Sequence, residues 1–250
     1  MSSMIDHRRF LQSGDWENWR REPTDQQRGL PPPPVEKPCP DGAALVDLVP
    51  PGDLTVGAMT VIQAIRQRRS RRKFTGEPLT LEELSFLLWA TQGLSRPGGG
   101  GSPNLRTVPS AGARHPFETY LLVNRVEGVA PGLYRYLPLE HKLCLLDEDR
   151  RTAREIHIAC YEQYVVESAV TFVWTAIPYR TEWRYATLAH RVILMDAGHL
   201  CQNLYLACEA IGAGTCAVGA YDQARLDAIL DVDGIDEMAI YVAPVGRVRG

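Results

Sequence analysis

The sequence predicts an α+β protein built around one mostly antiparallel sheet. Three strand-like segments, 119–123, 132–136 and 142–146, follow one another and are separated by turns that contain Gly and Pro. Segment 188–211 carries apolar residues at intervals of three and four, which is typical of a long, central, buried helix. Strands and helices do not alternate regularly, which argues against a doubly wound parallel sheet.

Length and composition indicate an ordinary globular protein. The chain has 250 residues, of which 45% are hydrophobic and 23% charged, enough for one substantial core. Its net charge of -3 provides no overall positive field, so a nucleic-acid partner is not expected. The sequence contains neither a membrane-length apolar run nor the apolar stretch of a signal peptide. We therefore expect a cytoplasmic protein without a membrane partner.

The cysteines and histidines show no metal-binding pattern. No two cysteines have the two-residue spacing of a zinc or thioredoxin-like motif, and the histidines lack ligand spacing. We expect no metal site and interpret the cysteines as buried free thiols. The six are Cys39, Cys144, Cys160, Cys201, Cys208 and Cys216.

The chain divides into a proline-rich N-terminal arm, residues 1–56, and a folded body, residues 57–250. The proline run at 31–34 excludes regular helix and central strand in that part of the arm. Trp16 and Trp19 offer apolar anchors, so the arm is expected to pack on the surface of the body. Disorder of the arm is the alternative.

The first part of the body predicts two helices. The first is indicated by apolar residues at intervals of three and leads into a basic cluster at 68–73; these residues are Met59, Ile62 and Ile65. Thr80 and Glu83 form a capping box at the start of the second. The glycine run 98–101 is interpreted as a flexible turn or lid, because no Lys-Ser or Lys-Thr pair follows it.

The second part of the body predicts the remaining elements. A helix is expected at 150–164 and a central strand at 169–177, where β-branched and aromatic residues are nearly continuous. After the long helix we expect a strand at 215–218 and an Asp-capped helix at 222–230. A strand at 238–245 closes the sheet.

Two kinds of local pattern could carry chemistry. In the basic cluster, Arg and Lys side chains next to Ser70 supply the donors that a terminal phosphate accepts. The alternative is a solvated helix end, where cations are favoured by the helix dipole. The small residues at 109–113 and 212–216 would let the backbone approach a flat ring closely, although each segment could also be a plain turn.

The order of these motifs resembles that of the nitroreductase superfamily, and more narrowly its SagB-type dehydrogenase branch, which includes azoline oxidases of peptide natural-product pathways. The resemblance covers roughly residues 62–247. It is carried by six segments in order: 68–74, 109–120, 132–136, 197–204, 214–219 and 244–247.

This resemblance implies a nitroreductase-like fold that binds FMN between the two protomers of a homodimer, with the long central helix at the dimer interface. Four residues match positions that hold the phosphate and ribityl chain: Arg68, Ser70, Arg72 and Arg247. Arg69 matches a position beside the flavin. The partner's loop matches Pro109, Ser110, Ala111 and Gly112, and the segment flanking the ring matches Gly214 and Thr215.

The sequence departs from the azoline oxidases at one motif. Those proteins resemble one another at a Trp-Lys-Tyr stretch whose Lys and Tyr are thought to remove protons, and here the stretch is Trp183, Arg184 and Tyr185. A guanidinium is a poor base, so the Lys role does not transfer, although Arg184 could orient a carboxylate or an enolate-like oxygen. Tyr185 is a candidate proton donor, or an aromatic residue that only packs at the rim of a pocket.

Two histidines have alternative interpretations. His199 lies within the long apolar helix and is predicted to be a hydrogen-bonded core residue. His115 follows the small-residue loop and could line a substrate pocket or sit in a surface turn.

These patterns predict an FMN-dependent oxidoreductase that oxidises a thiazoline, an oxazoline or a similar heterocycle by hydride transfer to the flavin. The substrate could be a small molecule, a peptide or a carrier-bound heterocycle. One alternative is an NAD(P)H-dependent reductase of nitro compounds or quinones. An alternative of another class is a flavin-binding partner or scaffold protein in a biosynthetic complex, with the arm as its docking element.

Overall fold

A computed structural model describes residues 8–14, 16–98 and 104–249. Its main sheet has seven strands in the order β1-β6-β5-β4-β7-β9-β8, and all six neighbouring pairs are antiparallel. The strands are β1 Leu45–Asp47, β4 Phe117–Val123, β5 Gly132–Leu137, β6 Lys142–Asp147, β7 Val170–Ala176, β8 Ala213–Thr215 and β9 Met238–Arg247. The α+β class, the antiparallel meander and the central strand are thereby confirmed.

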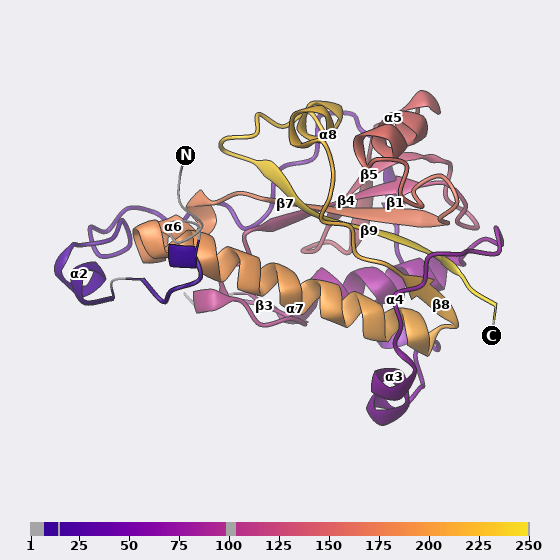
Figure 1. Cartoon of the computed structure of the whole chain (residues 1–250), viewed down its shortest axis with the longest axis horizontal. Coiled ribbons are helices and arrows are strands. Elements are labelled where there is room, and N and C mark those ends of the chain that lie inside the picture. Colours follow the sequence, from indigo (N-terminus) through magenta and orange to yellow (C-terminus); the bar gives the residue numbers. More distant parts are fainter. Residues whose placement is uncertain (1–7, 15, 99–103, 250) are drawn as a thin grey trace.

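Helices cover both faces of this sheet (Figure 1). Helices α4 (Leu81–Gln92) and α7 (Ala189–Ala210) bury their apolar sides against one face. Helices α5 (Arg151–Ala159) and α8 (Gln223–Ile229) pack with the other. Every residue of β4 and β7 is buried, because these strands have helices on both sides.

The local signals for α4 and α7 are confirmed. Both hydrogen bonds of the Thr80–Glu83 capping box are present, and the leucines behind it are fully buried. Helix α7 has 22 residues and turns its apolar stripe to the sheet. A separate two-stranded sheet joins β2 (Leu94–Arg96) to β3 (Leu105–Arg106). Part of the glycine run between them, residues 99–101, lies outside the described residues.

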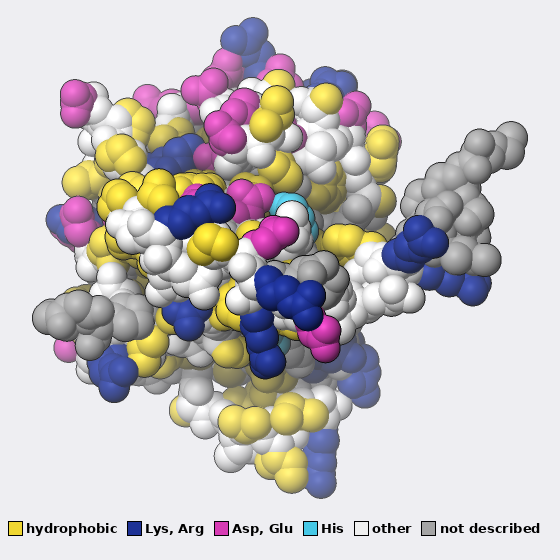
Figure 2. Space-filling model, turned by 90° about the vertical axis from the view of Figure 1, so that its left-hand side faces the viewer, with side chains coloured by type: hydrophobic (Ala, Val, Ile, Leu, Met, Phe, Trp, Pro, Cys, Tyr) yellow, Lys and Arg dark blue, Asp and Glu magenta, His cyan; other side chains and the backbone are white. Residues whose placement is uncertain are grey.

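Helix α3 (Val61–Gln67) forms where it was expected, and its apolar side faces outward. Only its Ala64 is buried, whereas the side chains of Ile62 and Ile65 are 57% and 58% exposed. The helix projects from the body, and apolar side chains are visible on the lower projection in Figure 2. Spacing alone identified the helix but not what its apolar side contacts.

Two expected boundaries were wrong. Helix α5 ends at Ala159, because Tyr161, Glu162 and Tyr164 have positive φ angles that no α-helix contains. Strand β8 lies at 213–215, and Val218 forms only an isolated bridge to Val242.

The arm lies against the body and contains short regular elements that the sequence did not indicate. Helix α2 (Trp16–Arg21) lies near α6 (Tyr179–Tyr185), and β1 extends the sheet beside β6. Between them the arm is held by backbone hydrogen bonds, including one from the Gln26 amide to the Trp183 carbonyl at 2.9 Å.

A disulfide between Cys39 and Cys144 also joins the arm to β6, so the interpretation of all six cysteines as free thiols was wrong. The two Cα atoms are 6.2 Å apart, within disulfide range, although the residues are separated by 105 positions. The other four cysteines are free and buried, as predicted.

Candidate functional site

The basic segment, residues 68–73, lies along β8 at the C-terminal end of α7. Ser70 forms a parallel bridge with Thr215, and the Arg71 amide donates to the Thr215 carbonyl at 2.8 Å. A Cβ on Gly214 would lie 2.4 Å from Arg71 Cγ, so only glycine allows this approach. The structure thus brings together the predicted residues Ser70, Gly214 and Thr215.

Two side chains of α7 that were not among the predicted site residues hold this segment in place. The Tyr205 hydroxyl lies 3.2 Å from Ser70 Oγ, and the Arg68 guanidinium sits 5.5 Å from the Tyr205 ring centre. The Arg69 amide donates to a buried Glu209 carboxylate oxygen at 3.1 Å. Their four-residue spacing on α7 is the only sequence signal that they share one face.

A cavity of about 540 Å³ opens beside this segment. None of the described residues that line it is acidic, and its polar side chains form a donor set suited to a phosphate: Ser70, Arg71, Arg72, Lys73, Thr75 and Arg249. The predicted Arg247 is not in this lining. Its guanidinium donates to both carboxylate oxygens of Glu83, at 2.5 and 2.7 Å, and to the Ile211 carbonyl.

The loop at 109–113 lies at the opposite end of α7. Ser110 Oγ donates to Asp196 at 2.6 Å, and the Ala111 amide donates to the same carboxylate at 3.0 Å. Burial raises the pKa of Asp196, and these two hydrogen bonds oppose that change. Asp196 therefore anchors the loop; with Glu209, it is one of two carboxylates among the buried residues of α7.

Gly112 brings this loop close to the candidate catalytic pair, Arg184 and Tyr185. It has a φ of 59°, and a Cβ there would lie 2.6 Å from Arg184 Cδ and 2.9 Å from the Tyr185 hydroxyl. Trp16 and Trp19 of the arm pack on the Tyr185 ring, with centres 6.2 and 6.1 Å away. The predicted loop and the predicted catalytic residues thus form one cluster.

The two histidines differ from one another. His115 is buried, and burial, followed by the charges of Arg106 and Arg114, lowers its pKa to about 3. His199 is 47% exposed and lies 3.8 Å from Asp196, so its interpretation as a core residue was wrong. The helix turns this side chain away from the sheet. Among the residues described, no group of His, Cys, Asp or Glu is arranged to hold a metal.

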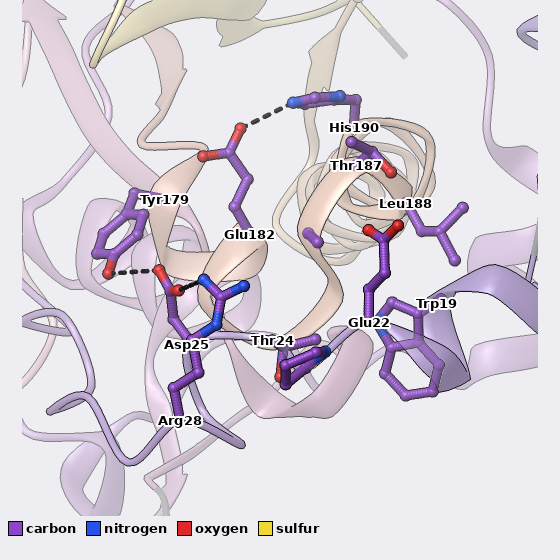
Figure 3. A pocket seen from close by; sticks show the side chains of 12 residues that line it. Trp19, Glu22, Thr24, Asp25, Arg28, Tyr179, Glu182, Thr187, Leu188 and His190 are labelled. Carbon is purple, nitrogen blue, oxygen red and sulfur yellow. Dashed lines mark hydrogen bonds and ion pairs between the residues drawn. The ribbon is translucent and has the colours of Figure 1, made fainter.

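A hollow of about 570 Å³ lies between the arm and α6, next to this cluster (Figure 3). Asp25 accepts hydrogen bonds from the Tyr179 hydroxyl and from Arg28, and His190 is 2.8 Å from Glu182. These groups point at one another rather than into the space, so the hollow presents few donors to a ligand.

The two clusters lie far apart within one chain. Asp196 anchors one and Glu209 the other, and at 1.5 Å per helical residue the separation along α7 is about 20 Å. A single protomer therefore carries two separated groups of predicted site residues. The face at the α2–α6 end is shown in Figure 2, where basic and apolar side chains lie side by side near the centre.

The fold is that expected of a nitroreductase-type protein. The nitroreductase family model matches residues 65–247, and the chain belongs to this family. A putative nitroreductase of Methanocaldococcus jannaschii is 37% identical over 183 residues, covering 72% of this chain and 87% of the relative. Membership of the family indicates an oxidoreductase.

Two further likenesses refine this result. A putative nitroreductase structure from Ralstonia eutropha is 28% identical with a TM-score of 0.65, and the match covers 88% of this chain and 100% of that one. The trifolitoxin-processing protein TfxB of Rhizobium leguminosarum bv. trifolii is 26% identical over 147 residues, covering 57% of this chain and 39% of TfxB. The second likeness supports the SagB-type branch. The described helices include none with the length and apolarity needed to cross a membrane.

Proposed function

We propose that the chain is an FMN-dependent dehydrogenase of the SagB type that acts as a homodimer with two shared flavin sites. The observation that carries this proposal is the separation of the two clusters at opposite ends of α7. If two α7 helices pair in opposite directions, the basic segment of one protomer meets the 109–112 loop of the other. Leu194 and Met195 on α7 are 48% and 44% exposed, which provides apolar surface for such pairing.

The residues present fit FMN. The basic cavity presents cationic and hydroxyl donors without a carboxylate among its described lining residues, as a phosphate requires. Arg68, Ser70 and Arg72 would hold the phosphate and ribityl chain, joined by Lys73 and Arg249 of the cavity lining, and Arg69 would lie beside the flavin. Arg247, which the resemblance also assigns to the phosphate, is paired with Glu83. Gly214 and Thr215 would flank the ring, and Pro109, Ser110, Ala111 and Gly112 would reach it from the partner.

Bound FMN would supply two-electron chemistry by accepting a hydride from the substrate. Tyr185 would exchange a proton with the substrate through its hydroxyl, which lies against Gly112. Arg184 would orient an oxygen of the substrate, because guanidinium donates hydrogen bonds and does not act as a base. The packing of Trp16 and Trp19 on Tyr185 would exclude water from this proton transfer.

The substrate class that fits this proposal is a thiazoline or oxazoline within a peptide. The likeness to a protein that processes a peptide toxin supports it. Dehydrogenation of such a ring to the azole removes a hydride, which the flavin would accept, and a proton, which the Tyr185 hydroxyl would relay to water as it releases its own proton. We propose that this takes place in the cytoplasm.

The absorption spectrum of the purified protein tests the cofactor, with the released flavin identified by chromatography. FMN near one per chain is expected. In Arg72→Ala, loss of a charge-assisted hydrogen bond of about 1.5 to 3 kcal/mol should weaken FMN binding roughly ten- to hundredfold. Arg66→Ala, on the exposed side of α3, is the matched control and should keep its flavin. Colourless protein that takes up no FMN would contradict the proposal and favour a scaffold role.

A second candidate is an NAD(P)H-dependent nitro or quinone reductase, which the 37% identity to a putative nitroreductase favours. Anaerobic addition of NADPH separates the two activities. Rapid bleaching of the flavin absorbance would favour the reductase, whereas bleaching by an azoline-containing peptide alone would favour the dehydrogenase.

A further inference from the structure

A second basic cavity, distinct from the one beside Ser70, lies under the arm and next to the candidate catalytic pair. Its volume is about 430 Å³, and it is bounded by arm residues between 26 and 35, by the 112–115 loop and by α6. Gly112 and Arg184 both line it, so it opens beside the Tyr185 hydroxyl.

The charges that line this cavity all have one sign. Arg106, Arg114 and Arg184 line it, and no Asp or Glu does so within the described parts of the chain. The nearby Glu118 is occupied elsewhere, since it accepts from Arg180 and from the Lys37 amide and lies 3.9 Å from Arg135. The charges of Glu118 and Glu36 partly offset Arg106, whereas Arg114 pairs with none of the carboxylates of the described residues.

Arg114 has an unsatisfied donor at this place. Only 9% of the residue is exposed; its Nε donates to the Arg180 carbonyl at 2.8 Å, and its guanidinium lies 4.6 Å from the Trp183 ring centre. Its Nη2 is buried and has no hydrogen-bond partner among the described residues. A buried charged donor without an acceptor is costly, which makes this atom a candidate for binding a ligand.

Neighbouring arginines add to the cost of burying the Arg114 charge. Burial, followed by the charges of Arg184 and Arg180, lowers the pKa of Arg114. Burial lowers the pKa of Arg106 to about 10, although its guanidinium donates to Gln92 and to the Val35 carbonyl at 2.7 and 2.9 Å. Both groups stay cationic at neutral pH, and an anion bound beside Arg114 and Arg184 would relieve the repulsion that lowers the pKa of Arg114.

We propose that this cavity binds a carboxylate of the substrate, with Arg114 Nη2 and the Arg184 guanidinium as its donors. Two guanidinium groups suit the two oxygens of a planar carboxylate. Bound there, the carboxylate fixes the substrate beside the Tyr185 hydroxyl. The substrate is then an acidic molecule, or a peptide with an acidic side chain or a free C-terminus near the ring that is oxidised. This assignment rests on the proposed function only for the role of Tyr185.

Calorimetry on the full-length protein as purified tests the site, with benzoate as the carboxylate probe and benzamide as its uncharged equivalent. Benzoate should bind at least tenfold more tightly than benzamide. Arg114→Gln should abolish that preference and leave the flavin content unchanged, whereas the exposed Arg96→Gln should preserve both. Arg184→Gln, at a less buried position, should also abolish the preference and serves if Arg114→Gln does not fold.

Three outcomes would overturn the assignment: equal binding of benzoate and benzamide, tighter binding of inorganic phosphate than of benzoate, and loss of flavin from Arg114→Gln. The last would show that the cavity belongs to the cofactor. Protein without flavin that still prefers benzoate would reject the proposed function and retain the carboxylate site.

Discussion

The two ends of α7 both gather arginines, but in opposite environments. At the C-terminal end, Arg69 and Arg72 are exposed, and the backbone amide of Arg69 donates to Glu209. At the N-terminal end, Arg114 and Arg180 are buried; Arg180 pairs with Glu118, and Arg114 donates to the Arg180 carbonyl. Exposed arginines can bind a ligand at little cost to the fold. Buried arginines are part of the fold, so their substitution affects stability and ligand binding together.

The largest effect is expected where the buried Arg180 meets its carboxylate partner, Glu118. Glu118→Gln leaves Arg180, which is 2% exposed, without its ionic partner, and should lower the free energy of unfolding by about 3 to 5 kcal/mol. Urea denaturation measures this. Asp47→Asn, which removes an ion pair with Lys142 at an 85% exposed side chain, should cost under about 1 kcal/mol. Similar values for both variants would remove the distinction between the two environments.

A smaller loss of stability is expected from Gly112→Ala. The new Cβ would strain a residue at φ 59° and push against Arg184 and Tyr185, so we expect a loss of about 2 to 3 kcal/mol and of the benzoate preference. Gly128→Ala has the same backbone problem at φ 78° but nothing within 4 Å, and should lose only about 1 kcal/mol. If the two variants unfold alike, the close approach at Gly112 is not what positions the catalytic pair.

The smallest effect concerns His115 and acid. Its pKa is about 3 in the folded protein against 6.5 as the ordinary value, so between these values the unfolded chain binds more protons. The stability from this group is full above pH 6.5 and falls as the pH decreases, by at most about 1.4 kcal/mol per pH unit. From about pH 7 to about pH 5.5, His115→Gln should therefore lose less stability than the wild type. Identical slopes for the wild type and His115→Gln would contradict the burial of His115.

Local signals predicted most of the fold. The capping box at Thr80 and the apolar stripe of α7 depend on residues three or four apart, and these interactions formed as expected. The positions of Cys39, β1 and the exposed face of α3 depend on contacts between distant segments, which spacing does not record. His199 was assigned to the core because it lies within the apolar helix α7. The buried stripe covers only one side of that helix, and His199 lies outside it.

The candidate site was predicted in its parts rather than in its arrangement. Ser70 beside Thr215, and Gly112 beside Tyr185, were both named from motifs and lie together in the structure. The supporting residues Asp196, Tyr205 and Glu209 were not identified, because their positions along α7 do not show which distant segments they contact. Their roles are visible only in the structure, where α7 lies against the basic segment 68–73 and the 109–113 loop.

The position of β9 affects how the chain can fold during synthesis. This strand lies between β7 and β8, second from one edge of the sheet, and it covers the edge of β7. Until Arg247 has left the ribosome, the fully buried strand β7 exposes a row of unpaired N–H and C=O groups along one edge. A nascent chain stalled before this point would present an apolar strand ready to pair with another chain, which makes it a target for chaperones and for aggregation.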